Sequence, residues 1–155
     1  MSPNRKAFLD MIAHSELGPE LLAVSDNGYN VMVGSTAAHP RLFKSYANHP
    51  HVLVPLGGGL SSTAAGRYQI LARNYDAFKE QLGLPDFSPA SQDAIALEMI
   101  RQRGALPLVD AGAFDSAVKR MAKIWASFPG SGYGQHQSQL VALRKVYQEA
   151  GGALA

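Results

Sequence analysis

Cysteine is absent from this 155-residue chain, which excludes disulfides, thiol nucleophiles and zinc sites built on thiolates. No apolar run approaches the length of a membrane span. Polar residues at Asp10, His14 and Glu16 interrupt any signal-like apolar core near the N-terminus. We therefore expect a single globular domain over residues 1–155, with no export signal of its own and no stable membrane association.

Charge is sparse and unevenly placed. Charged residues make up 17% of the chain and hydrophobic residues 46%, which is typical of a folded globular protein. Residues 1–100 hold seven Lys and Arg against nine Asp and Glu, whereas residues 101–155 hold seven against three. The basic C-terminal part would suit an anionic polymer such as cell wall or nucleic acid. An ordinary solvated surface is the preferred interpretation, and nucleic-acid binding is ranked last because no helix face gathers Lys and Arg.

The apolar spacing predicts a mostly helical α+β protein. Phe8, Ile12 and Glu16 are spaced i, i+4 and i+8, which predicts a helix from about residue 3 to 16, stopped by Gly18 and the following proline. Further helices are predicted from about residue 63 to 82, from 89 to 100, from 114 to 125, and after residue 135 to about 150.

A small β element is predicted between the first two long helices. The segment GYNVMVG, Gly28–Gly34, alternates in part and is bounded by glycines, so it is interpreted as a short strand. HVLVPL, His51–Leu56, is its expected partner, and the His-Pro pairs between the two segments indicate a loop.

Glu16 breaks the pattern of the first helix because it continues the apolar stripe. An unpaired charge at such a position is costly, and desolvation raises the pKa of a carboxyl. A raised pKa keeps a proton available near neutral pH, as a general acid requires. From spacing alone a structural carboxylate that reaches solvent or pairs with an arginine is the commoner case.

Other candidate sites carry weaker signals. Asp26 is a possible second carboxylate, although Asp-Asn-Gly is also an ordinary turn. His39, His49 and His51 could ligate zinc, but the neighbouring prolines already explain the segment, so no metal is expected. The glycines and serines at 57–62 form neither a nucleophile elbow nor a phosphate-binding loop.

Several segments, in order along the chain, resemble the phage lambda endolysin family. They are RKAFLDMIAHSE, GYNVMVG, STAAGRYQIL, LGLPDFSPASQDAIAL, RGALPLVDAG, IWASFPGSGYGQ and EAGG. The resemblance covers nearly the whole chain and implies a lysozyme-like fold with a substrate cleft. It departs at residue 14, a histidine where the best-known member has a large aromatic, and over residues 17–27 and 35–59, where the matching is poor.

The resemblance implies a set of site residues. The essential acid of the family ends the first helix, which here is Glu16. The implied substrate-binding residues are Tyr29, Ser62, Thr63, Gly66, Arg67, Tyr68, Gln69, Tyr133, Gly134 and Gln135. We expect Arg67, Tyr68 and Gln69 to stand at a helix start, with some lining the cleft and some locking its floor. Gln69 is the preferred ligand because its amide both donates and accepts hydrogen bonds.

The implied activity is a lytic transglycosylation of peptidoglycan between N-acetylmuramic acid (MurNAc) and N-acetylglucosamine (GlcNAc). Glu16 alone would act as acid and then as base, giving a 1,6-anhydro product without a cofactor. The alternative is a hydrolytic lysozyme that uses Glu16 and Asp26, because ordinary glycosidases need two carboxyl groups. A non-catalytic wall-binding or phage structural protein is a third possibility, which the retention of Glu16 disfavours.

The family also implies where such a protein acts. A phage endolysin accumulates in the host cytoplasm and is released by a separate membrane-permeabilising protein to reach the periplasmic cell wall. Glycan strands of peptidoglycan are the expected partner. A monomer is expected because no long apolar surface is visible in the sequence pattern.

Overall fold

A computed structural model describes residues 1–129 and 136–155. The chain forms two compact units, one made of residues 1–16 with 96–155 and the other of residues 17–95. The boundary falls at the end of the first helix and inside the fourth. The single catalytic domain expected from the sequence stays a prediction.

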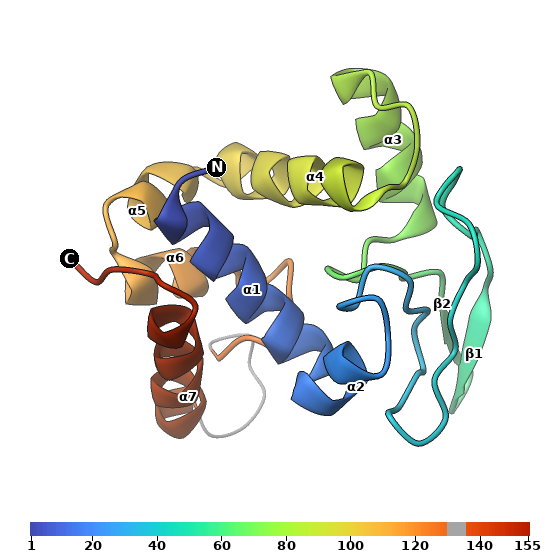
Figure 1. Cartoon of the computed structure of the whole chain (residues 1–155), viewed down its shortest axis with the longest axis horizontal. Coiled ribbons are helices and arrows are strands. Elements are labelled where there is room, and N and C mark those ends of the chain that lie inside the picture. The colour runs from blue at the N-terminus through green and yellow to red at the C-terminus, as the bar shows by residue number, and fades with distance from the viewer. Residues whose placement is uncertain (130–135) are drawn as a thin grey trace. The chain divides into compact units, whose positions relative to one another are not determined.

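The first unit is helical (Figure 1). Its elements are α1 (Pro3–Leu17), the second half of α4 (Pro89–Gln102), α5 (Leu106–Asp110), α6 (Phe114–Met121) and α7 (His136–Glu149). The unit includes α1 up to residue 16 and α4 from residue 96. Phe8 of α1 is buried, and its ring meets Phe114 and Phe128 edge-on at centroid distances of 6.1 and 6.5 Å. These contacts stabilise the unit because edge-to-face aromatic pairs add to the burial of apolar area.

The two ends of the chain meet in this unit. The backbone N–H of Ala153 donates to the Asn4 side-chain oxygen at 2.9 Å, and the Asn4 amide donates to the carbonyl of Val109 at 3.3 Å. The Ala155 N–H donates to the carbonyl of Gly112 at 2.9 Å. The C-terminal tail therefore closes over the segment between α5 and α6, which fixes the first turns of α1.

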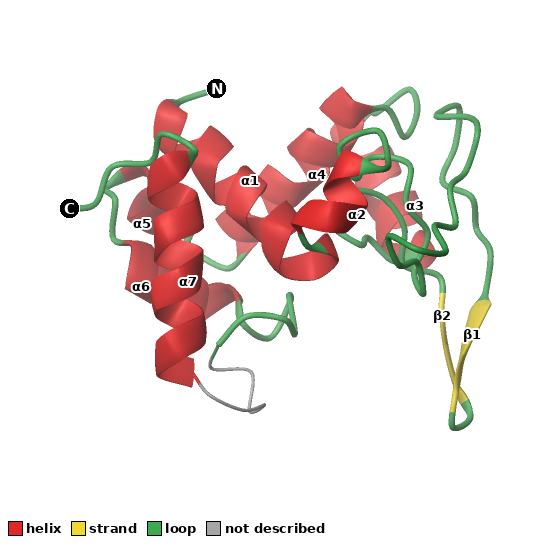
Figure 2. Ribbon diagram, turned by 60° about the horizontal axis from the view of Figure 1, so that its bottom comes forward, coloured by secondary structure: helices red, strands yellow, loops and turns green. Residues whose placement is uncertain are grey.

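The second unit combines helices with a β-hairpin, drawn in yellow in Figure 2. Its elements are α2 (Pro19–Ala23), β1 (Val54–Gly57), β2 (Leu60–Ser62), α3 (Ala72–Leu82) and the first half of α4. The strands pair antiparallel, with Val54 opposite Ser62 and an irregularity before the glycine turn. Tyr75 of α3 packs its ring against Phe87 at 5.0 Å in the core of this unit.

Most of the predicted helices are confirmed, with shifts of one or two residues at several ends. α1 extends to Leu17, α4 to Gln102, and α7 covers the last predicted helix. The predicted 114–125 helix is shorter, because regular helix ends at Met121 and turns follow. The five-residue helices α2 and α5 were not predicted, since each is too short to show an apolar period.

The predicted β element exists, but one of its two strands and the strand pairing were predicted wrongly. Residues 28–34 form turns with isolated bridges from Val31 to Leu42 and from Met32 to Ala65, not a strand. The segment predicted as its partner instead contributes β1, which pairs with β2. Hydrogen bonds from the neighbouring loops, such as Met32 N–H to the carbonyl of Arg41 at 2.8 Å, replace the expected ladder.

The helix predicted from residue 63 begins only at Ala72, so Arg67, Tyr68 and Gln69 do not stand at a helix start. They lie in a tight loop closed by a bridge between Ala65 and Ile70. Residues 60–62 form β2 instead. Small residues occur at strand ends and in loops as well as in helices. The small residues of this segment therefore could not show which of the three structures it forms.

Gly66 is the residue that this loop requires. Its φ is +82°, and a Cβ there would lie 2.3 Å from Oε1 of Gln92. That oxygen accepts the backbone N–H of Arg67 at 2.9 Å, so the glutamine is fixed in place. Only glycine satisfies both the left-handed backbone and the close approach.

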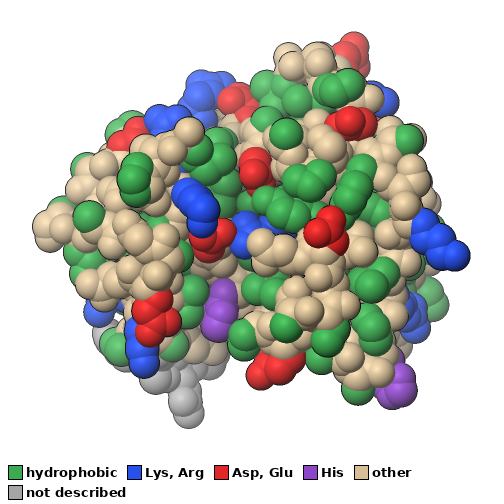
Figure 3. Space-filling view, in the orientation of Figure 1, with side chains coloured by type: hydrophobic (Ala, Val, Ile, Leu, Met, Phe, Trp, Pro, Cys, Tyr) green, Lys and Arg blue, Asp and Glu red, His purple; other side chains and the backbone are tan. Residues whose placement is uncertain are grey.

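The surface mixes charges of both signs. On the face drawn in Figure 3, Lys and Arg lie scattered among Asp, Glu and hydrophobic side chains. Over the residues that the structure describes, no helix is both long and apolar enough to span a membrane.

We expect Gly66→Ala to lower the free energy of unfolding by about 3 kcal/mol or more, because it adds backbone strain and a steric overlap. Gly58→Ala is the matched control, since Gly58 has a φ of +60° but no atom within 4 Å of the point that an added Cβ would occupy. The control should lose only about 1 kcal/mol. Equal losses in urea denaturation of the two variants would contradict the packing role of Gly66.

Candidate active site

Glu16 lies in the last turn of α1, in the first compact unit. Phe8 and Ile12, two turns and one turn earlier on the same stripe, are almost fully buried. Glu16 itself is half-buried. The stripe that packs the helix thus carries a carboxyl group to the edge of the core, as the spacing predicted.

A pair of serine hydroxyls adjoins this carboxyl group. The Ser15 hydroxyl donates to Ser127 Oγ at 2.8 Å. Ser127, in the turns that follow α6, hydrogen-bonds to the side chain of Glu16. Because Ser127 accepts from Ser15, its own hydrogen points to the carboxylate, and the two serines orient the Glu16 side chain.

Burial raises the pKa of the Glu16 carboxyl from its ordinary value of 4.5 to about 7, and the hydrogen bond from Ser127 acts in the opposite direction. Burial dominates because the charged form loses more hydration than one hydroxyl returns. Near neutral pH, both the acid and the carboxylate of Glu16 are populated. One group can therefore donate a proton and take one back without a large free-energy penalty in either step.

Arg67 and Tyr68 are held inside the second unit, with exposed fractions of 5% and 1%. The Arg67 guanidinium donates to the Asn27 carbonyl at 3.0 Å and to the Tyr68 hydroxyl at 3.1 Å. It also lies over the Tyr29 ring, 5.3 Å from the centroid. These contacts hold both side chains inside the loop, and their expected role in the substrate cleft stays a prediction.

Asp93 joins the two tyrosines of this cluster. Its Oδ1 accepts the hydroxyl of Tyr68 at 2.6 Å and that of Tyr29 at 2.9 Å. Burial, together with the neighbouring Asp93 charge, raises the pKa of both phenols. Tyr29, which remains half-buried, therefore keeps its proton and its position.

The sequence reasoning missed Gln92 and Asp93. Gln92 is fully buried, and its amide donates to the carbonyls of Tyr29 and Phe87 at 3.0 and 2.9 Å. A signal was available, because Gln92 stands three residues before buried Ile95 on the stripe of α4. A polar residue on an apolar stripe was the same signal that made Glu16 a candidate.

Gln69 has a φ of +52° and is half-buried. Its amide nitrogen donates to the carbonyl of Gly66 at 2.9 Å, which fixes the side chain across the loop. Within the described residues its amide oxygen has no hydrogen-bond partner. The amide nitrogen also lies 3.5 Å from the Val31 carbonyl. The role of Gln69 as a substrate ligand stays a prediction.

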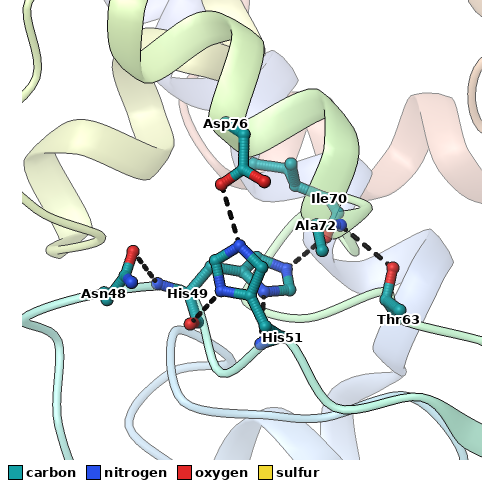
Figure 4. A network of polar contacts seen from close by, with 7 residues as sticks. All are labelled: Asn48, His49, His51, Thr63, Ile70, Ala72 and Asp76. Carbon is teal, nitrogen blue, oxygen red and sulfur yellow. Dashed lines mark hydrogen bonds and ion pairs between the residues drawn. The ribbon is translucent and has the colours of Figure 1, made fainter.

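Ser62 and Thr63 lie at the end of β2 and connect the hairpin to the loop that precedes α3. The Ser62 oxygen accepts the N–H of Ala64 at 3.1 Å. The Thr63 oxygen accepts the N–H of Ala72 at 3.0 Å, the first residue of α3 (Figure 4). Thr63 thus caps α3 and ties down the strand that leaves the hairpin.

The strand that enters the hairpin is tied to the same region by two histidines (Figure 4). His49 is buried and lies 2.8 Å from the Ile70 carbonyl through Nε2, while its Nδ1 accepts the His51 N–H at 2.9 Å. This pattern requires neutral His49 with hydrogen on Nε2. Burial lowers the pKa of His49 accordingly.

His51, in contrast, must carry a positive charge. Its Nδ1 lies 2.7 Å from the His49 carbonyl and its Nε2 lies 2.8 Å from Asp76 Oδ1. Both partners only accept hydrogen bonds, so both contacts are satisfied only by the imidazolium. The Asp76 hydrogen bond raises the pKa of His51, against smaller lowering effects from burial and Lys79.

Asp26, the alternative second carboxylate, lies in the second unit and is exposed. Its Oδ2 accepts the hydroxyl of Tyr46 at 2.5 Å. Burial, together with this hydrogen bond and the Asp26 charge, raises the pKa of Tyr46. Asp26 therefore has a structural partner in this geometry.

Among the residues described, no group of three or more His, Asp and Glu side chains is arranged to hold a metal ion. Tyr133, Gly134 and Gln135, assigned to substrate by the resemblance, lie outside the described residues.

Comparison with known proteins confirms the resemblance. A family model described as Endolysin matches residues 6–154. The chain is 49% identical over 152 residues to the endolysin of Escherichia phage lambda, covering 97% of this chain and 92% of that protein. It is 43% identical over 157 residues to the endolysin of Escherichia phage P2, covering 98% and 95%.

Solved structures agree. Bacteriophage lambda lysozyme complexed with a chitohexasaccharide matches with a TM-score of 0.88 at 48% identity, covering 100% of this chain and 98% of that one. The lysozyme-like, mostly helical α+β fold expected from the sequence is thereby confirmed.

We expect His51→Asn to destabilise the protein most at low pH. The folded pKa of His51 is raised, so its contribution is complete below the unfolded pKa of 6.5 and is lost as pH rises through the folded value. Asparagine tolerates the φ of +52° at this position, which limits backbone effects. Chemical denaturation from pH 5.5 to 8.5 measures the difference from the parent protein.

The matched control is His39→Asn, since His39 is exposed and its ring makes no hydrogen bond within the described residues. A stability loss in His51→Asn that does not change with pH would contradict the imidazolium assignment.

Proposed function

The chain belongs to the Endolysin family, and we propose that it is a phage endolysin that cleaves the MurNAc–GlcNAc bond of peptidoglycan by lytic transglycosylation. The single observation that carries the proposal is the Glu16 carboxyl, half-buried at the end of α1 with its pKa raised to about 7. The lambda lysozyme structure in complex with a chitohexasaccharide supports a glycan as the ligand.

The first step uses Glu16 as an acid. Protonated Glu16 donates its hydrogen to the glycosidic oxygen while the bond from MurNAc C1 to that oxygen breaks, and GlcNAc leaves with a new hydroxyl. Positive charge develops at C1 and the ring oxygen. The Glu16 carboxylate that forms is close to its own titration midpoint at neutral pH, so neither protonation state is strongly disfavoured.

The second step uses the same group as a base. The C6 hydroxyl of the MurNAc residue attacks C1, the C1–O6 bond forms, and the hydroxyl hydrogen passes to the Glu16 carboxylate. The product is a 1,6-anhydro sugar, no water is consumed, and Glu16 regains its starting proton. Ser15 and Ser127 hold the carboxyl group in one orientation for both transfers.

The second unit supplies substrate contacts in this proposal. Gln69 is the one half-buried residue of the otherwise buried Gly66–Ile70 loop, and its amide oxygen accepts hydrogen bonds from sugar hydroxyl or N-acetyl groups. Arg67 and Tyr68 position that loop from its buried side. Tyr133, Gly134 and Gln135 remain proposed substrate residues by resemblance.

A hydrolytic lysozyme that uses Glu16 with Asp26 is the alternative. It would place water at C1 and give products with a reducing end. The hydrogen bond from Tyr46 to Asp26 favours the single-carboxyl route, because a base or nucleophile already bound to a phenol must first lose that partner.

We further propose that the protein acts as a monomeric single domain, without a cofactor. It would remain in the host cytoplasm until a separate membrane-permeabilising protein gives it access to the periplasmic wall. The release route is the one that the resemblance to the endolysin family implies, and the monomeric state and the lack of a cofactor are those expected from the sequence.

We expect digestion of purified Gram-negative peptidoglycan to release muropeptides that are one water lighter than hydrolytic products and lack a reducing end. Mass spectrometry distinguishes the two. Glu16→Gln should lower the cleavage rate at least about a thousandfold, because the proton donor is lost. Sedimentation of the variant with intact sacculi should show unchanged wall binding.

Reducing-end products would overturn the transglycosylase proposal and direct mutagenesis to Asp26. Full lysis by Glu16→Gln would overturn the catalytic role of Glu16 itself.

A further inference from the structure

A pocket of about 440 Å³ lies in the second unit, where the hairpin leads toward α3. Its lining comes from the flanks of both strands and from the first turn of α3. The lining residues are Leu53, Ser61, Ser62, Thr63, Leu71, Ala72 and Arg73. The volume falls within the range of sites that bind small ligand groups.

The hydroxyl groups of this pocket are arranged to donate. The oxygens of Ser62 and Thr63 already accept backbone N–H groups, from Ala64 at 3.1 Å and Ala72 at 3.0 Å. A hydroxyl carries one hydrogen besides its lone pairs, so each oxygen that is used as an acceptor leaves its hydrogen for another partner. Exposed Ser61 on β2 adds a third hydroxyl.

Arg73 supplies a positive charge at the same pocket. It is exposed and forms no ion pair or hydrogen bond through its side chain within the described residues. Asp76, one turn further along α3, is held by His51. Other arginines, such as Arg5 with Asp110 and Arg144 with Asp115, are paired. The guanidinium of Arg73 thus remains available to a ligand.

The pocket lining contains no Asp or Glu, so its polar chemistry consists of hydrogen-bond donors and a cation. Leu53, whose exposed fraction is 64%, and half-buried Leu71 add apolar surface. Such a set of groups fits a carboxylate next to small apolar groups. Where the lactyl carboxyl of MurNAc is amide-linked to a peptide stem, the sugar backbone itself is neutral and offers nothing for Arg73 to neutralise.

We propose that this pocket is a subsite for the peptide stem of peptidoglycan, with Arg73 binding a stem carboxylate and Leu53 and Leu71 contacting the small side chains of the stem. The inference rests on the proposed function, because it takes the substrate to be peptidoglycan. It makes Arg73 a specificity-determining residue that distinguishes wall glycan from peptide-free polysaccharide.

The test is a binding measurement in the Glu16→Gln background, so that no ligand is cleaved. Isothermal calorimetry compares a soluble peptide-bearing glycan tetrasaccharide, the same glycan stripped of peptide by an amidase, and chitohexasaccharide. Arg73→Gln should weaken binding of the peptide-bearing glycan about fivefold, as expected for an exposed charge pair. Binding of the other two ligands should not change.

Arg103→Gln is the matched control. Arg103 is an exposed arginine just beyond α4 in the other compact unit, so the substitution removes the same charge. It should leave all three affinities unchanged. An equal loss with Arg103→Gln would mean non-specific attraction and overturn the subsite.

Two further outcomes would also overturn the inference. An equal loss on the amidase-treated glycan would assign Arg73 to the lactyl carboxylate that the amidase leaves behind, not to the peptide. If the Arg73→Gln variant bound the peptide-bearing glycan as tightly as the parent protein, Arg73 would not contribute to binding. Failure of the premise that the substrate is peptidoglycan would look different, because then no glycan would bind even with Arg73 and Arg103 intact.

Discussion

Desolvation of one carboxyl group is the constraint on which the chemistry of this protein depends. Glu16 sits where the apolar stripe of α1 runs out, half-buried, and its pKa rises to about 7. The ionised form is disfavoured in the folded state, so at neutral pH the group opposes folding. Tight packing earlier in the helix, at Phe8 and Ile12, offsets that cost. The Ser127 hydrogen bond then limits the rise in pKa, and Ser15 holds Ser127 in place.

In the second unit, side-chain hydrogen bonds hold the irregular loop at Gly66 in place where regular secondary structure is lacking. The side chain of buried Gln92 takes the place of a strand partner, because it hydrogen-bonds to the backbone of Arg67, Tyr29 and Phe87. The Asp93 carboxylate accepts hydrogen bonds from the hydroxyls of Tyr29 and Tyr68. Because buried polar groups are costly when unpaired, the loop is stable only when the whole set is satisfied. Within the loop, only Gln69 stays half-buried.

The regular helices could be predicted because their apolar stripes and their Gly and Pro boundaries are local. The place of Glu16 on such a stripe is equally local, whereas its catalytic role came from the family resemblance and stays a prediction. The loop at Gly66 could not be predicted, because its conformation is imposed by Gln92, 26 residues away in sequence, and no local pattern contains that contact. The β pairing failed likewise, since residues 28–34 bond to separate loops at Leu42 and Ala65. Burial of Arg67 and Tyr68 also depends on distant partners, so residue type alone did not reveal their supporting role.

The most direct test of the central claim is a carbon-13 NMR titration of the Glu16 side-chain carboxyl, with the resonance assigned by its absence in Glu16→Gln. A midpoint near pH 7 is expected, because burial outweighs the Ser127 hydrogen bond. A midpoint near the ordinary value of 4.5 would mean that the group is fully ionised at neutral pH. Glu16 would then lack the proton that the first step of the proposed reaction requires.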